Sequence, residues 1–279
     1  MTYPNLGIQY HFFEPPFASG GTGEIFRALD RNKGEIVAVK RLFDTIKDPD
    51  IIRKFKIEAN IYLMLNHKNI VSLKDFKEIN GEHFLVMEYI QGHPLSEFID
   101  TVTGPIPLSV TKKIMAQILD AIHYAHTKHV PIDGYSGVLH LDLKPSNILI
   151  SNNHLVKVID YGISQGSDEQ RVNKIIGTPM YMAPEQFDVD QDLTNKTDIY
   201  SLGLVLHQMI TATFPYKENV ASMDELRYRI LSTETDRIIE SYKYANIQVQ
   251  DVIDKATSKS PYDRYGSCVE MKSDLLNIE

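Results

Sequence analysis

The chain has 279 residues, of which 43% are hydrophobic and 24% are charged, and these shares fit an ordinary globular protein rather than a disordered or fibrous chain. This length predicts one large domain or two joined lobes and excludes a small disulfide-stabilised protein. Its 29 Lys and Arg residues against 37 Asp and Glu residues give a net charge of −8, so we expect neither nucleic acids nor anionic membranes as partners.

The cysteine content and the length of the apolar stretches indicate the cellular compartment in which the protein is expected. The single cysteine, Cys268, excludes an intrachain disulfide and fits a reducing environment. The first residues lack the basic and apolar regions of a secretory signal, and no uninterrupted apolar stretch reaches the length of a membrane span. We therefore expect a cytoplasmic protein that does not bind a membrane.

Apolar patterning in the first 90 residues predicts strands and one helix. Short apolar runs at residues 36–39 and 84–87 are typical of strands. Between them, apolar residues recur at steps of three and four over residues 52–62, after an acidic segment that contains Pro49. This spacing predicts a helix between the two strands.

Helical patterns take over from about residue 108 and are interrupted by two strand-like runs, residues 148–150 and 156–159. The segments with apolar residues on one helical face are 114–125, 199–209 and 269–276. A strand-rich first part and a helix-rich remainder predict an α+β chain of two lobes that join near residues 88–92.

The first segment with chemical content lies between two strand patterns and contains Gly20, Gly21 and Gly23. Glycines there would let backbone N–H groups approach phosphate oxygens, because a β-carbon would block the approach. Alone, such a cluster is more often the turn of a hairpin, and that interpretation stays open. A Walker A loop is excluded, because no Gly-Lys-Ser/Thr follows and a strand comes next.

The second such segment places Lys40 inside an apolar strand. Removing an ammonium group from water is costly, so a buried Lys40 needs an anionic partner. Glu58 is the obvious candidate, since its helical neighbours Phe55 and Tyr62 are predicted to face the core. A lysine that extends to solvent at a strand edge is the alternative.

The third segment runs from His140 to Leu149 and places Asp142 and Asn147 on either side of a proline-containing loop, with Asp160 at the end of the next strand-like run. Carboxylate and amide oxygens at neighbouring strand and loop ends suit Mg²⁺. Any one of these Asp residues could simply cap a turn. The joint pattern of His, Asp, Lys, Pro and Asn at fixed offsets is too specific for that explanation.

Together these segments resemble the catalytic domain of eukaryotic-like (Hanks-type) serine/threonine protein kinases, in the family's order and over residues 1–279. The resemblance implies a bilobal protein-kinase fold, with an antiparallel-sheet N-lobe with one main helix over about residues 1–88, a hinge at about 88–92 and a mostly helical C-lobe over about 93–279. It implies transfer of the γ-phosphoryl group of ATP, bound with Mg²⁺ or Mn²⁺, to Ser or Thr hydroxyls of a protein substrate.

The resemblance also implies roles for single residues. Asp142 matches the catalytic aspartate, and Lys40, with Glu58 as its partner, matches the lysine that contacts the α and β phosphates. Lys144 would neutralise charge on the transferred group. The metal ligands would be Asn147 and Asp160. The other nucleotide contacts would be Ala18, Gly20, Gly21, Gly23, Ile25, Ala38, Met87, Glu88, Ile90 and Leu149.

Further matches lie in the helical part. Glu185 closes the activation segment in Ala-Pro-Glu, and Arg264 resembles the arginine that pairs with it. Asp198 resembles the residue that anchors the backbone of the catalytic loop. Lys144 is typical of serine/threonine members, which pair it with a threonine at the position of Thr178. The residues around Glu185 look most like those of bacterial members.

Three residues depart from the family pattern. Ala18 stands in place of the first loop glycine, Tyr161 in place of a phenylalanine, and Leu141 in place of the arginine before the catalytic aspartate. In relatives that carry this arginine, its guanidinium binds a phosphate on the activation segment. A leucine cannot bind a phosphate.

The activation segment itself offers few acceptors. Between residues 160 and 178 the hydroxyl side chains besides Tyr161 are Ser164 and Ser167. We therefore hypothesise that activity does not require phosphorylation of this segment.

Two other functions stay open at this point. A pseudokinase that binds nucleotide as a scaffold is favoured by the three departures, and a small-molecule phosphotransferase of the same fold is the less favoured alternative. A turn-rich stretch at residues 131–137 lengthens the connection to the catalytic loop and is expected to be a surface excursion. The sequence leaves a homodimer open.

Overall fold

The computed structural model describes residues 6, 9–20, 22–99, 104–129, 137–161, 179–188, 190–216, 222–238 and 247–279. Gly21, Ser164, Ser167 and Thr178 lie outside these described residues, as does most of the turn-rich stretch, residues 131–136. The internal contacts divide the chain into two compact units, Met1–Gln91 and Gly92–Glu279, and the division falls within residues 88–92.

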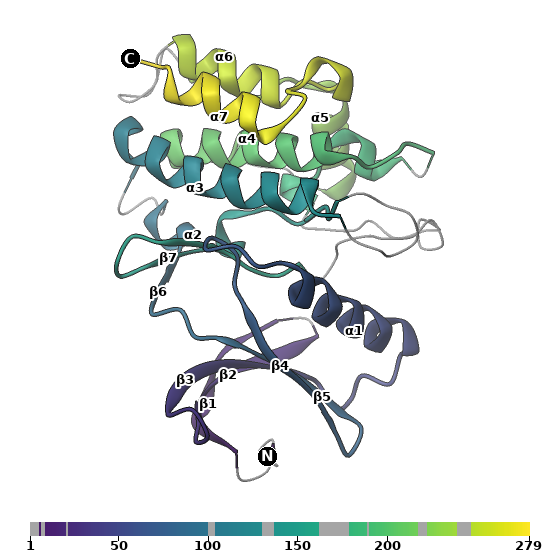
Figure 1. Cartoon of the computed structure of the whole chain (residues 1–279). Coiled ribbons are helices and arrows are strands. Elements are labelled where there is room, and N and C mark those ends of the chain that lie inside the picture. The colour runs from purple at the N-terminus through teal and green to yellow at the C-terminus, as the bar shows by residue number, and fades with distance from the viewer. Residues whose placement is uncertain are drawn as a thin grey trace. The chain divides into compact units, whose positions relative to one another are not determined.

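A five-stranded antiparallel sheet and one long helix make up the first unit (Figure 1). The strands, in the spatial order β1-β2-β3-β5-β4, are β1 (Tyr10–Ser19), β2 (Gly23–Asp30), β3 (Glu35–Leu42), β4 (Leu73–Ile79) and β5 (Glu82–Glu88). The helix α1 (Pro49–Met64) begins after Asp48, whose side chain accepts a hydrogen bond from the Asp50 N–H at 2.9 Å. Pro49 fits the first turn because its missing N–H would have no helical acceptor there.

The alternation of side chains along β3 decides which of them face α1. Leu42 packs against α1, whereas Val37 and Val39 belong to a separate apolar cluster on the other face of the sheet. Successive side chains point to opposite faces of a strand, so Lys40 lies on the same face as Leu42. The pleat of the sheet therefore directs Lys40 toward the helix that carries Glu58.

The second unit is mostly helical and contains a small antiparallel sheet of three strands (Figure 1). Its strands are β6 (Gly92–Pro94), β7 (Ile148–Ser151) and β8 (Val156–Val158). Its helices are α2 (Leu95–Phe98), α3 (Leu108–Thr127), α4 (Asn195–Thr211), α5 (Met223–Ser232), α6 (Ile247–Ala256) and α7 (Cys268–Leu276). Short 3₁₀ turns are η1 (Pro145–Asn147), η3 (Pro179–Tyr181), η4 (Pro184–Phe187) and η5 (Pro261–Asp263).

Helix α4 lies at the centre of the second unit. It contacts α3 and α6, and apolar residues are buried around its whole circumference, as expected of a helix enclosed by others. Thr194 caps its start by accepting the Lys196 N–H at 3.3 Å. A central, enclosed helix is a rigid base for any side chain that it carries.

The predicted α+β fold class, with an antiparallel sheet first and helices second, is confirmed. The strand-like run at 156–159 ends one residue earlier, at Val158. Strands β1 and β4 were not bounded by the sequence patterns, because almost none of their residues are buried and the alternation is weak. None of the helices in the described ranges combines the length and apolar character that a membrane-spanning helix needs.

Gly203 of α4 generates a stability prediction. A Cβ at this position would lie 2.7 Å from Thr257 Cγ2 and 2.9 Å from Ala256 Cβ. Helix propensity alone favours alanine over glycine by about 1 kcal/mol, whereas overpacking a core costs about 1–3 kcal/mol. We expect Gly203→Ala to lower the free energy of unfolding in urea, because the packing effect dominates.

A double variant separates the two effects. Thr257→Ser removes the nearest methyl group and keeps a hydroxyl for the Ile253 carbonyl, which Thr257 contacts at 2.8 Å. Adding it to Gly203→Ala should restore part of the lost stability. A stabilised Gly203→Ala protein would show that α4 and α6 are not in close contact here.

Candidate active site

Two glycines of the glycine-rich segment, Gly20 and Gly23, lie where β1 ends and β2 begins. The Gly20 N–H donates to the Gly23 carbonyl at 2.9 Å, so the hairpin interpretation holds. Gly23 is required by the protein itself, because a Cβ there would lie 2.2 Å from the Arg41 carbonyl oxygen of β3. Among the described residues, nothing lies within 4 Å of a Cβ built at Gly20. No contact in that part of the chain explains Gly20, and its bare backbone fits the close approach of a phosphate.

Lys40 and Glu58 form the predicted ion pair. The Lys40 Nζ lies 2.8 Å from Glu58 Oε1 and 3.1 Å from Oε2, and the exposed fractions of the two side chains are 16% and 5%. The carboxylate holds the ammonium group at a defined position inside the first unit, so the solvated-lysine alternative is wrong. Such a fixed cation is suited to bind the oxygens of an anionic ligand.

The strand register gathers other predicted residues around Lys40. Ile25 of β2 lies opposite Lys40, and Ala38 of β3 lies opposite Met87 of β5. Residues opposite one another in a sheet point to the same face, so these side chains share the face of Lys40. Ala18 of β1 in turn lies opposite Ile25.

The last residue of β5, Glu88, and the nearby Ile90 differ in the hydrogen bonds of their backbone groups. The Glu88 N–H donates to the Ser72 carbonyl at 3.0 Å, and the Glu88 side chain accepts the Ser72 N–H at 2.8 Å. The backbone groups of Ile90 make no hydrogen bond to another described residue. A ligand with amide-like edges could therefore bind to Ile90 without displacing protein contacts.

Asp142, Lys144 and Asn147 come together in the second unit. The Lys144 Nζ lies 2.8 Å from Asp142 Oδ2, and the Asn147 Nδ2 donates to the same oxygen at 3.1 Å and to the Asp142 carbonyl at 2.9 Å. Asp142 and Asn147 are buried. The turn η1 brings Asn147 back onto Asp142, so an ammonium and an amide both lie within hydrogen-bond reach of one carboxylate.

Asn147 and Asp160 offer oxygen atoms of the kind that Mg²⁺ prefers. Because the amide nitrogen of Asn147 donates to Asp142, its Oδ1 remains as the oxygen ligand of this side chain. The Ile159 N–H donates to the Asn147 carbonyl at 3.0 Å, which ties the residue before Asp160 to η1. Asp160 has a left-handed backbone with φ of 67°, which Asp tolerates better than most residues. This donor set fits a divalent cation that is also held by phosphate oxygens.

No larger metal cluster competes with this donor set within the described ranges, where no group of three or more His, Cys, Asp or Glu residues converges. Leu149 lies on β7 between Pro94 of β6 and Lys157 of β8. It is the one predicted nucleotide contact that belongs to the second unit.

Asp198 of α4 holds the backbone of the catalytic loop. Its fully buried carboxylate accepts the N–H groups of His140 and Leu141, both at 2.8 Å, and lies 2.7 Å from His126 Nε2. Burial opposes ionisation, but the contacts with His126 and His140 outweigh it and keep the pKa of Asp198 below its ordinary value of 3.8. The anchoring role that the resemblance implied is present, and His126 is a partner that sequence reasoning missed.

His140 connects the loop to the strand that precedes Asp160. Its Nε2 lies 3.0 Å from the Ile159 carbonyl, and its Nδ1 accepts the Asp142 N–H at 3.3 Å. These contacts fit a neutral ring with its proton on Nε2. The ring centroid lies 4.5 Å from that of Tyr161, which is fully buried. One imidazole therefore links the residues on either side of the candidate site.

Glu185 and Arg264 form the predicted second ion pair. The two bonds run in parallel, from Nη1 to Oε1 at 2.7 Å and from Nη2 to Oε2 at 2.8 Å, and both side chains are buried. Thr197 of α4 donates to the same carboxylate at 2.9 Å. The segment around η4 is thus fixed to the helical base.

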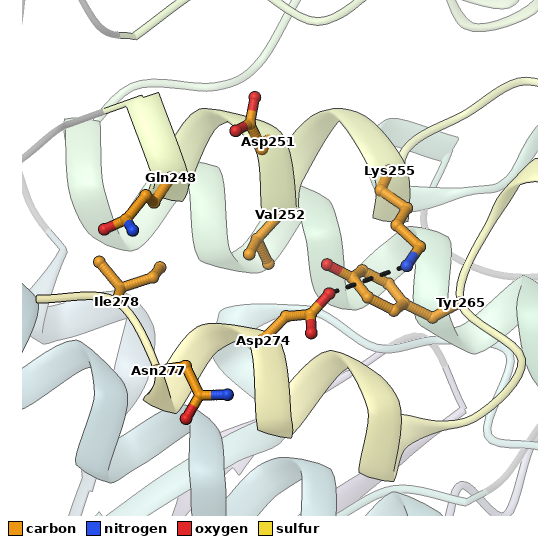
Figure 2. Close-up of a pocket in the computed structure, with 8 residues that line it drawn as sticks. All are labelled: Gln248, Asp251, Val252, Lys255, Tyr265, Asp274, Asn277 and Ile278. Atoms are coloured by element: carbon orange, nitrogen blue, oxygen red, sulfur yellow. Dashed lines mark ion pairs between the residues drawn. The ribbon is translucent and has the colours of Figure 1, made fainter.

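A separate depression of about 260 Å³ lies between α6 and α7. Figure 2 shows that Lys255 and Asp274 point toward one another there, and their charged atoms are 3.7 Å apart. Gln248, Asp251 and Tyr265 also line it. None of the predicted site residues does, so this depression is not a candidate for the predicted chemistry.

We predict that Asp198→Asn lowers the free energy of unfolding near neutral pH by about 3 kcal/mol, because the amide cannot accept all the donors that the carboxylate accepts. The depressed pKa makes the contribution of Asp198 pH-dependent. It is fully present above the unfolded-state pKa and is lost as the pH falls through the lower folded-state pKa.

Urea denaturation at several pH values from about 7 to about 3 checks this sign, since the difference between wild type and variant should shrink below about pH 5. A difference that stays constant over this range would contradict an ionised, buried Asp198.

Comparisons with known proteins agree with this geometry. The family model described as protein kinase domain matches residues 16–276. The chain is 34% identical over 260 residues to serine/threonine-protein kinase PrkC of Bacillus subtilis, an alignment that covers 92% of this chain and 38% of the relative. It is 31% identical to serine/threonine-protein kinase PknB of Mycobacterium leprae, with 99% and 44% covered.

A third relative, serine/threonine-protein kinase Pkn1 of Myxococcus xanthus, is 29% identical, with 92% of this chain and 36% of the relative covered. The chain therefore spans less than half the length of these curated relatives. The family match extends over nearly the whole chain and includes both ion pairs and the loop around Asp142. The chain belongs to the protein kinase domain family.

Proposed function

We propose that this domain transfers the γ-phosphoryl group of MgATP to Ser or Thr hydroxyls of protein substrates. The observation that carries the proposal is the arrangement at Asp142, whose buried carboxylate lies 2.8 Å from the Lys144 ammonium and 3.1 Å from the Asn147 amide. The names of the relatives, all serine/threonine-protein kinases, support the acceptor class. Lys144 supports it too, because the resemblance associates this residue with serine/threonine members.

Asp142 would orient the acceptor hydroxyl and accept its proton as the new phosphoester bond forms. Lys144, which contacts the same carboxylate, would stabilise negative charge on the transferred group. The hydrogen bond from Asn147 restricts the Asp142 carboxylate to one orientation. Positioning of this kind accounts for much of the rate enhancement in phosphoryl transfer.

Lys40 would bind the α and β phosphates, and Glu58 would keep its ammonium group in place. The turn around Gly20 would cover phosphate oxygens with backbone N–H groups. The adenine would contact backbone groups at Glu88 and Ile90. The apolar side chains proposed to flank it are Ile25, Ala38 and Leu149, and Met87 would lie beside the backbone that the adenine contacts.

Asn147 Oδ1 and the Asp160 carboxylate would hold the divalent cation, Mg²⁺ or Mn²⁺. When bound to these two side chains, the cation would neutralise negative charge on the phosphate oxygens. The left-handed backbone at Asp160 determines where its carboxylate can reach. We assign these two residues the role of ligands because their oxygens are the hard donors that this cation prefers.

We also propose that activity does not require phosphorylation of the activation segment. Leu141 is buried and apolar, so the position before Asp142 carries no cation for a phosphate. Its backbone is held instead by Asp198 at 2.8 Å.

The first experiment measures radiolabel transfer from ATP to a generic basic protein. Asp160→Ala and Asp142→Asn should each reduce the rate by about a thousandfold or more, because one removes a metal ligand and the other the proton acceptor. Asp120→Asn is the matched control, since Asp120 pairs with Lys272 at 2.7 Å on the surface of α3. Near-normal transfer by Asp160→Ala would contradict the assignment.

The same assay distinguishes an active kinase from the alternative of a pseudokinase that serves as a scaffold. A wild-type chain that binds ATP and transfers no label would be a pseudokinase, and the proposal would fail. Phosphosite mapping of the substrate by mass spectrometry would show whether the acceptors are Ser and Thr.

The second experiment treats the purified protein with a phosphatase until mass spectrometry finds no phosphate on residues 161–178. Turnover should stay within about twofold of the untreated protein, because no guanidinium at residue 141 is present to bind a phosphate. Loss of most activity, followed by recovery on rephosphorylation, would refute the independence proposal.

A further inference from the structure

Both polar atoms of the Gln186 side-chain amide, on η4, form hydrogen bonds with backbone groups. Its Oε1 accepts the Ala183 N–H at 2.9 Å, and its Nε2 donates to the Leu141 carbonyl at 3.2 Å. The first contact is local to η4, whereas the second crosses 45 residues of sequence. Gln186 therefore connects the segment that Glu185 anchors to the loop that carries Asp142.

The carbonyl that Gln186 binds belongs to the peptide bond directly before Asp142. The N–H of that peptide donates to His140 Nδ1 at 3.3 Å. This one peptide group is thus held on its carbonyl side by Gln186 and on its N–H side by His140. Rotation of the peptide plane would break both bonds, so they restrict the direction in which the Asp142 side chain leaves the backbone.

Leu141 makes this restraint necessary. Its φ of 62° lies in the left-handed region, which is strained for a residue with a Cβ because the Cβ comes too close to the following carbonyl oxygen. Asp198 binds the Leu141 N–H, and Gln186 binds the Leu141 carbonyl. The strained residue is therefore held by buried or partly buried polar groups on both sides, and its own side chain, which is apolar and buried, contributes none of these bonds.

We propose that Gln186 is a positioning residue that sets the orientation of Asp142 through the Leu141 carbonyl and links the activation segment to the catalytic loop by a neutral amide. This inference rests on the proposed function, because it assigns Gln186 a part in the same reaction. The link needs no phosphate and no arginine, which gives the independence from phosphorylation a structural basis.

Gln186→Met tests the proposal, because methionine has a similar length and cannot make either hydrogen bond. We expect kcat to fall by about tenfold or more while the KM for ATP changes by less than about twofold, since Asp142 would be misplaced and the nucleotide contacts would stay intact. Gln186→Glu adds a pH readout. Its carboxylate can accept from Ala183 but cannot donate to Leu141 until it is protonated, so its kcat relative to wild type should rise as the pH falls toward the carboxyl pKa.

Gln117→Met is the matched control. Gln117 of α3 bridges backbone groups in the same way, since it accepts the Val156 N–H at 3.1 Å and donates to the His154 carbonyl at 3.3 Å, and neither of these partners belongs to the loop that carries Asp142. It should lose comparable stability and keep kcat within about twofold of wild type. Equal losses of kcat in the two methionine variants would assign Gln186 a merely structural role.

Amide hydrogen exchange distinguishes failure of this inference from failure of the proposed function. Exchange in peptides that cover residues 138–144 should speed up in Gln186→Met and stay unchanged in Gln117→Met, whether or not the wild type transfers phosphate. A wild type without transfer, but with this exchange difference, would overturn the function and keep the positioning role. Unchanged exchange and unchanged kcat in Gln186→Met would overturn the inference.

Discussion

A single buried carboxylate, that of Asp198, is the interaction on which the candidate site of the second unit depends. A charge that is fully removed from water is tolerated only when hydrogen bonds replace its hydration, and Asp198 receives them from His126 and from two consecutive backbone N–H groups. Because those N–H groups belong to the loop before Asp142, the energetic need of the carboxylate becomes a geometric constraint on the loop. Helix α4 supplies the rigid base, since it is enclosed by its neighbours.

The two units contain polar links of three kinds, and the chemistry of each link suits its task. Glu185 and Arg264 form a buried bidentate pair with well-defined geometry, which suits a permanent anchor. Lys40 and Glu58 are less enclosed, so the ammonium group stays accessible to an anion. Gln186 makes a neutral link to the catalytic loop. The residue before Asp142 is the apolar Leu141, so the charge-free link from Gln186 joins a part of the loop that itself carries no charge.

The Lys40 ion pair could be predicted from the sequence because a buried charge is stable only beside a group of opposite charge. Lys40 in an apolar strand required an anion, and a helix face supplied Glu58. The family resemblance supplied the pairing of Glu185 with Arg264 and the anchoring role of Asp198. Residues that act through neutral hydrogen bonds gave no such signal. His126 and Gln186 are ordinary residues on a helix and a turn, and their contacts with Asp198 and Leu141 cross 72 and 45 residues of sequence.

Local physics alone determined the strands and helices with strong periodicity, the capped start of α1, and the kinds of oxygen and nitrogen groups in the catalytic loop. The tertiary structure decided which backbone groups those side chains would bind, and it separated Gly23, which is required by the approach of β3, from Gly20, which is not. The reason is physical. The spacing of apolar residues and the presence of a charged residue in an apolar segment can be recognised from the residue types within a short stretch of sequence. A hydrogen bond to a distant backbone carbonyl depends on how the whole unit packs and does not restrict the residue types of neighbouring positions.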